Sequence, residues 1–222
     1  MNILKTLNSN ISFGQGNINF EEIDNLKIKN YRCLSPNTIS GETFSYRQLS
    51  DLKRLHNAGI DNIIDFRAEA QSDFGKICQN EGLKYLAFPL DTLWCRNKSS
   101  YFSTRKDGKK IATKNLVDKL AAFIAIIKNG NTYMGCHYGI DRTNIGVILN
   151  FLFSNFDNIW TPQILSWPEQ SKKSVMNKDF KIIKRIIKSL TKEQKQNLNI
   201  PNNFYEQALI KFKLILLRNK MI

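Results

Sequence analysis

Apolar positions along the chain follow two patterns, one typical of helices and one typical of strands, in alternating segments. Apolar side chains at every third or fourth residue predict helices over 45–58, 113–128 and 143–153. A shorter, polar segment predicts a further helix over 70–80. Continuous or alternating apolar runs bounded by turn residues predict strands over 31–34, 62–67, 83–90 and 132–136. This order of strand, helix and strand predicts an α/β fold with a central, mostly parallel sheet flanked by helices.

The two ends of the chain differ from this core, which we place at residues 31–155. Residues 1–30 are polar and rich in asparagine, so we expect a polar N-terminal segment with little regular structure. Within residues 156–222, the stretches 178–190 and 204–217 predict two helices that pack on the core as a C-terminal helical layer, within a single domain. A basic amphipathic helix can also lie on an anionic membrane, which is the less common outcome.

Length and composition point to an ordinary globular protein. The 222 residues suffice for one full core, and 42% of them are hydrophobic. No apolar run approaches the roughly 20 residues that a membrane-spanning helix needs. Residues 1–13 lack the apolar core of a signal peptide. We therefore expect a cytoplasmic protein, although a secreted effector exported by another route would look the same.

The cysteine spacing bears on metal and disulfide sites, and the net charge bears on binding partners. The cysteines at positions 33, 78, 95 and 136 are far apart and form no cluster with histidine, so the sequence predicts neither a zinc site nor a disulfide framework. The formal net charge of +14 would attract anionic partners such as phosphorylated substrates, RNA or acidic membranes. A solvated, lysine-rich surface accounts for most of this charge, so the anionic surface is a secondary expectation.

The residues with the clearest chemistry are 135–143, Gly-Cys-His-Tyr-Gly-Ile-Asp-Arg-Thr, between a predicted strand and a predicted helix. Cys136 offers a nucleophile, and Arg142 offers a planar guanidinium that can bind two phosphate oxygens. The residues between them can wrap so that their backbone N–H groups face an anion. The loop opens onto a helix N-terminus, which stabilises a bound phosphate and a thiolate alike. The pattern predicts a phosphate-binding loop that carries a nucleophile.

With this Cys-x5-Arg-Thr signature, the chain resembles the cysteine-dependent protein tyrosine and dual-specificity phosphatase superfamily. The resemblance covers roughly residues 31–155. Many members of the superfamily carry similar short segments, in the same order along the chain, at the places of Tyr31-Arg32, Asp65-Phe66-Arg67 and Phe88-Pro89-Leu90-Asp91. The resemblance implies a fold like that of the dual-specificity phosphatases and a reaction that needs no metal or cofactor.

The resemblance also implies roles for the residues of the loop. Cys136 would be the nucleophile, Arg142 would bind the phosphoryl group, and Thr143 would hydrogen-bond the sulfur and help it leave. Substrate binding would fall to the loop residues His137, Tyr138, Gly139, Ile140 and Asp141, together with Arg142. Gly139 would mark the point where the backbone turns closest to the phosphate.

A carboxylic acid is needed to protonate the leaving group, and the same group can then activate water. By its position in the resemblance this acid is Asp91, after the predicted strand 83–90. Asp141, within the loop, is the alternative, because some phosphoinositide phosphatases of the superfamily carry Asp-Arg-Thr there. Asp107 is a third candidate, on the basic stretch 96–110, which we expect to be a loop.

Two positions depart from the usual pattern. Gly135 stands where the superfamily usually has a histidine that holds the loop and favours the thiolate, which leaves Cys136 dependent on backbone dipoles, Thr143 and Arg142. Asn144 stands where glycine is usual. Asp-Arg-Thr-Asn also occurs in lipid phosphatases of the Sac type, but the loop lacks the lysines that help some phosphoinositide phosphatases bind extra phosphates.

Three functions remain open on these grounds. The first is a phosphatase for phosphotyrosine, with or without phosphoserine and phosphothreonine, that acts through a phosphocysteine intermediate. The second is a phosphatase for a phosphoinositide, an inositol phosphate or an RNA 5′-phosphate. The third is an inactive phosphate-binding module, which Gly135 suggests and the intact Cys136, Arg142 and Thr143 oppose.

Overall fold

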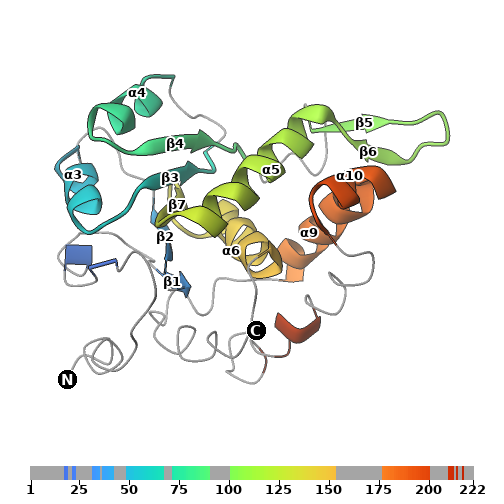
Figure 1. Cartoon of the computed structure of the whole chain (residues 1–222). Coiled ribbons are helices and arrows are strands. Elements are labelled where there is room, and N and C mark those ends of the chain that lie inside the picture. The colour runs from blue at the N-terminus through green and yellow to red at the C-terminus, as the bar shows by residue number, and fades with distance from the viewer. Residues whose placement is uncertain are drawn as a thin grey trace.

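A five-stranded sheet runs through the molecule (Figure 1). The computed structural model describes residues 18–19, 22–23, 32–35, 37–42, 49–67, 72–90, 101–153, 177–200, 210–212, 214 and 217. The strand order is β1-β2-β7-β3-β4, with only β1 and β2 antiparallel. The strands are β1 (Arg32–Ser35), β2 (Thr38–Glu42), β3 (Asn62–Asp65), β4 (Lys84–Ala87) and β7 (Thr132–Cys136). The α/β fold with a mostly parallel central sheet is therefore confirmed.

One face of the sheet is covered by α3 (Leu49–Asn57) and α4 (Ser72–Asn80). Ile63 and Tyr133 point to this side from neighbouring strands and are fully buried there. The sequence predicts both helices, and their apolar stripes explain why they lie against the strands.

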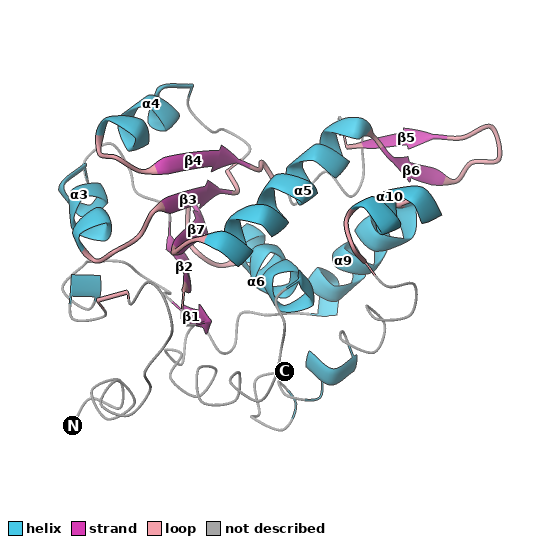
Figure 2. Ribbon diagram, viewed as in Figure 1, coloured by secondary structure: helices cyan, strands magenta, loops and turns pink. Residues whose placement is uncertain are grey.

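The other face is covered by α5 (Lys114–Asn129) and α6 (Asp141–Phe153), with α9 (Asn177–Ser189) packed beyond them. Ile64 and Met134 point to this side, because successive strand residues face opposite ways. Figure 2 shows the resulting layers of helix on both sides of the strands. A parallel sheet buried on both faces explains why β3 and β7 each carry two consecutive apolar residues, Ile63-Ile64 and Tyr133-Met134.

Helix α6 lies close against the sheet because Gly146 has no side chain. A Cβ atom at Gly146 would stand 2.2 Å from the ring of Phe66, the residue that follows β3. This close approach fixes the start of α6 relative to the strand ends, and so positions the loop that joins β7 to α6.

The structure corrects the sequence-based prediction in three places. Strand β2 is not predicted because three of its buried residues, Thr38, Ser40 and Gly41, are not apolar. The stretch predicted as a loop over 96–110 contains part of a hairpin, β5 (Phe102–Thr104) with β6 (Lys110–Ala112). Its Asp107-Gly108 turn is a typical hairpin signal among lysines. The short helix α10 (Lys192–Asn197) is not predicted either.

The C-terminal helix α9 packs on the core through Ile183, Ile186 and Ile187, all fully buried. Of the predicted helix 204–217, the structure describes residues 210–212, 214 and 217, all of them helical. No helix in the described part of the chain is long and apolar enough to cross a membrane.

Candidate active site

Cys136 is the last residue of β7, the middle strand of the sheet. In the sheet, Cys136 pairs with Glu42 at the end of β2. The residue before it, Gly135, pairs with Asp65 at the end of β3. The three parallel strands therefore end together, and the chain turns there into α6. The carboxyl ends of parallel strands are where α/β folds place ligands.

The thiol of Cys136 has a defined partner. Thr143 Oγ1 lies 3.1 Å from Cys136 Sγ and donates a hydrogen bond to it. Both residues are buried, with Cys136 only 3% exposed. A donated hydrogen bond stabilises negative charge on the sulfur, whether the sulfur is about to attack or has just been expelled.

Gly139 shapes the turn between Cys136 and α6. Its φ of +65° lies in the left-handed region, and its N–H donates to the Cys136 carbonyl at 3.1 Å. A Cβ atom here would stand 2.5 Å from the backbone of Gly41 and Glu42. Only glycine fits both the angle and the space, so the loop lies directly against the end of β2.

The remaining loop residues surround this turn. His137 and Tyr138 are exposed, and their rings pack edge to face with centroids 4.4 Å apart. Tyr138 is 65% exposed, the largest value among the exposed large hydrophobic side chains of the described chain. Ile140 and Arg142 are half-buried, and Arg142 sits in the first turn of α6.

Asp141 begins α6 and is joined to the C-terminal layer. Lys178 Nζ donates to Asp141 Oδ1 at 3.1 Å, with both side chains about half exposed. This hydrogen bond raises the pKa of Lys178. Helix α9 therefore begins beside the loop, an arrangement that the sequence did not reveal.

Of the other two candidate acids, the structure places Asp107 alone, and it lies away from Cys136. Asp91 lies outside the described residues. Asp107 lies in the turn of the β5–β6 hairpin, where its carboxylate is 4.0 Å from Arg105 and 3.8 Å from Lys109. In Figure 1 this hairpin projects away from the central sheet, so Asp107 does not share the site with Cys136.

Beside the loop, a buried ion pair ends β3. Arg67 Nη2 lies 2.7 Å from Asp65 Oδ2, and Arg67 Nε contacts both carboxylate oxygens. Tyr85 donates to Asp65 Oδ2 at 3.1 Å, and burial, reinforced by Asp65, raises the pKa of Tyr85. Because Asp65 pairs with Gly135 in the sheet, this cluster fixes the strand end next to the nucleophile.

Arg32 is a site residue whose place the sequence did not reveal. It is fully buried on β1, and burial lowers its pKa to about 10, while the charges of Cys136 and Asp179 act in the opposite direction. It is therefore still a cation at neutral pH. Asp179 is 1% exposed and accepts from Asn144 Nδ2 at 3.4 Å. The only sequence signal is a charged residue within an apolar strand.

This buried cluster gives a testable prediction. We expect Arg32→Met to lower the free energy of unfolding by roughly 3 kcal/mol, because the buried carboxylate of Asp179 then loses the favourable charge of Arg32. Asp179→Asn should also destabilise, and the double variant should be more stable than the sum of the two effects predicts. Urea unfolding of the four proteins measures this cycle. Strictly additive effects would show that the two charges do not interact.

Among the described residues, no three His, Cys, Asp or Glu side chains come close enough together to hold a metal ion.

Comparison with known proteins identifies no family. Neither a protein-family model nor a curated protein matches the sequence.

Among solved structures, a DUF442 protein from Shewanella putrefaciens CN-32 is 15% identical with a TM-score of 0.49, over 78% of this chain and 99% of that one. PTPMT1 in complex with PI(5)P is 13% identical with a TM-score of 0.39, over 82% and 99%. The PP-IP phosphatase SIW14 from S. cerevisiae, crystallised with citrate as its core catalytic domain, is 12% identical with a TM-score of 0.39, over 89% and 96%. Likenesses this distant carry no argument about function, which rests on the site itself.

Proposed function

We propose that this chain is a phosphate-monoester hydrolase that acts through Cys136. The observation that carries the proposal is the buried hydrogen bond from Thr143 to Cys136, at the turn between the middle strand and α6. A cysteine in this position, with a donor to its sulfur and a helix N-terminus facing it, can both attack phosphorus and leave again.

In the first step the Cys136 thiolate attacks phosphorus. The S–P bond forms, the bond to the leaving oxygen breaks, and a carboxylic acid gives that oxygen a proton. Arg142 and the first N–H groups of α6, which have no partner within the helix, would bind the phosphoryl oxygens. We assign the proton to Asp91, since Asp141 already accepts from the Lys178 ammonium.

In the second step water attacks the phosphocysteine, and a proton of the water passes to the carboxylate that the acid became in the first step. The S–P bond breaks, inorganic phosphate leaves, and the sulfur recovers its electron pair. Thr143 stabilises the departing thiolate through its hydrogen bond, so it contributes most to this step.

Phosphotyrosine in proteins is the substrate that we propose first. The sulfur is buried while His137 and Tyr138 form an exposed aromatic pair beside it, which suits an aromatic ester that reaches into the loop. The alternatives are a phosphoinositide, an inositol phosphate and an RNA 5′-phosphate.

Phosphate release from an aryl phosphate, in the presence of EDTA, tests the proposal. We expect turnover that EDTA does not affect, and release from phosphotyrosine peptides that exceeds release from the three alternative substrates. Release from only one of the alternatives would keep the mechanism and change the substrate. No release from any of them would leave a phosphate-binding module.

A further inference from the structure

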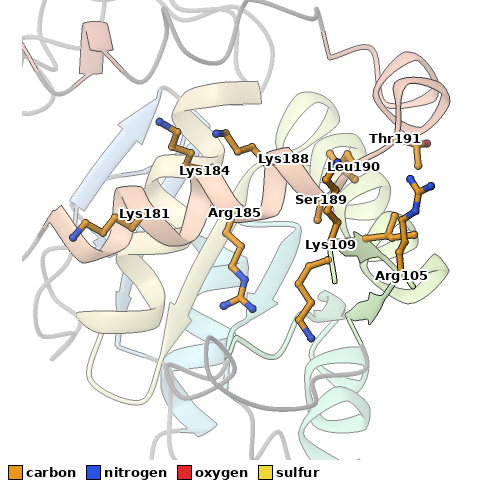
Figure 3. A pocket seen from close by; sticks show the side chains of 11 residues that line it. Arg105, Lys109, Lys181, Lys184, Arg185, Lys188, Ser189, Leu190 and Thr191 are labelled. Carbon is orange, nitrogen blue, oxygen red and sulfur yellow. The ribbon is translucent and has the colours of Figure 1, made fainter. Parts of the chain in front are cut away.

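A concave site with no residue of the Cys136 loop in its described lining lies between the β5–β6 hairpin and α9 (Figure 3). We call it the basic pocket. Its volume is about 610 Å³, within the range of small-molecule sites. The hairpin contributes Arg105, Lys109 and Lys110 to its lining, and α9 contributes Lys181, Lys184, Arg185 and Lys188. None of the described residues that line it is acidic, and none belongs to the Cys136 loop.

The elements that carry these cations, the β5–β6 hairpin and α9, are held together by two contacts. The Arg185 guanidinium lies over the ring of Phe102 in β5, 5.4 Å from its centroid. In Figure 3, Arg185 and Lys109 extend to one side of α9, and Lys184 and Lys188 extend to the other. Gln194 of α10 donates to the Ala112 carbonyl in β6 at 3.4 Å and closes a capping box with Thr191. The hairpin and the α9–α10 turn are therefore joined.

Such a concentration of like charge is unfavourable without an anion. Lys181, Lys184 and Lys188 recur at three- and four-residue spacing, so they repel one another along one side of α9. Asp107 is the hairpin's own acid, but its contacts with Arg105 and Lys109 are long and exposed, and such pairs neutralise little. Several phosphate groups on one molecule would neutralise the pocket.

The residues that line the pocket favour a compact anion over a polymer or a membrane. Single-stranded nucleic acid is bound by cations together with exposed aromatic rings, and no aromatic residue is among the described residues that line the pocket. A bilayer surface would need a basic face with several apolar residues to insert, whereas Ile111 and Leu190 are the apolar residues among the described lining. Guanidinium groups such as those of Arg105 and Arg185 suit phosphate oxygens.

We propose that the basic pocket binds a compact anion carrying several phosphate groups, such as a polyphosphorylated cyclitol or the headgroup of a polyphosphorylated lipid. Because the Cys136 loop contributes nothing to the lining, this proposal holds whether or not the chain hydrolyses phosphate esters.

Calorimetric titration of the full chain tests it, with inositol hexakisphosphate as the probe and inorganic phosphate at equal ionic strength as the reference. We expect the triple variant Lys181→Gln, Lys184→Gln, Lys188→Gln to weaken binding of the probe by about tenfold or more. The matched control is Lys53→Gln, Lys76→Gln, Lys128→Gln, which removes three exposed lysines from α3, α4 and α5 and should bind like the wild type.

Two further probes separate the sources of the ligand. Phosphatidylcholine vesicles that contain a phosphoinositide, bound only when the three α9 lysines are present, would assign the pocket to a lipid headgroup. Equal affinity of the pocket variant and the control variant for inositol hexakisphosphate would overturn the proposal. So would tighter binding of a short single-stranded RNA than of the compact anions.

Discussion

Cys136→Ser is expected to lower kcat for an aryl phosphate by about 10⁴-fold or more, because a serine hydroxyl at this position has no base to activate it. Binding of the phosphate ester should persist, since the backbone of the loop and Arg142 are unchanged. Steady-state kinetics measures the first effect, and calorimetric titration with a slowly hydrolysed phosphopeptide measures the second.

Cys78→Ser provides the matched control. Cys78 and Cys136 are both free and buried. Burial raises the pKa of Cys78 to about 12, so its thiol stays protonated at neutral pH, which disfavours it as a nucleophile. Cys78→Ser should keep near-wild-type turnover. Equal activity of Cys136→Ser and the wild type would refute the nucleophile assignment.

Gly139→Ala is expected to lower kcat/KM by about 100-fold or more, because a misplaced phosphate loop loses most of its binding geometry. The new Cβ would stand 2.5 Å from the backbone of Gly41 and Glu42 in β2, where nothing can yield by rotating a side chain. The loop must therefore move away from the strand end. Kinetics combined with urea unfolding separates the loss of activity from the loss of stability.

Gly108→Ala is the control for the backbone angle alone. Gly108, in the hairpin turn, has a φ of +78° but no atom within 4 Å of an added Cβ. The Gly108→Ala variant should lose roughly 1 kcal/mol in its free energy of unfolding, because an L-residue is strained in the left-handed region. Its turnover should not change. If both alanine variants behave alike, the contact of the loop with β2 is not what shapes the site.

Much of the core is predictable from local patterns. Ile63 and Ile64, or Tyr133 and Met134, are consecutive apolar residues that face opposite sides of a sheet covered by helices. The apolar runs on either side of residues 135–143 therefore suffice to place the cysteine between a strand and a helix.

What the sequence did not reveal depends on contacts between distant positions. Strand β2 pairs with β7 across more than ninety residues and buries polar side chains, so it has no apolar signal of its own. Arg32 and Asp179 lie on β1 and α9 and act on one another only after both elements pack against α6. The contact of Lys178 with Asp141 depends in the same way on where α9 packs.

The role of Cys136 is tested most directly by trapping the covalent intermediate. The wild type would be mixed with an aryl phosphate, quenched in acid within one turnover, digested with pepsin and examined by mass spectrometry. We predict one added phosphoryl group on the peptide that contains Cys136, and none on the same peptide from Cys136→Ser. Steady phosphate release while the wild-type peptide stays unmodified would contradict the account.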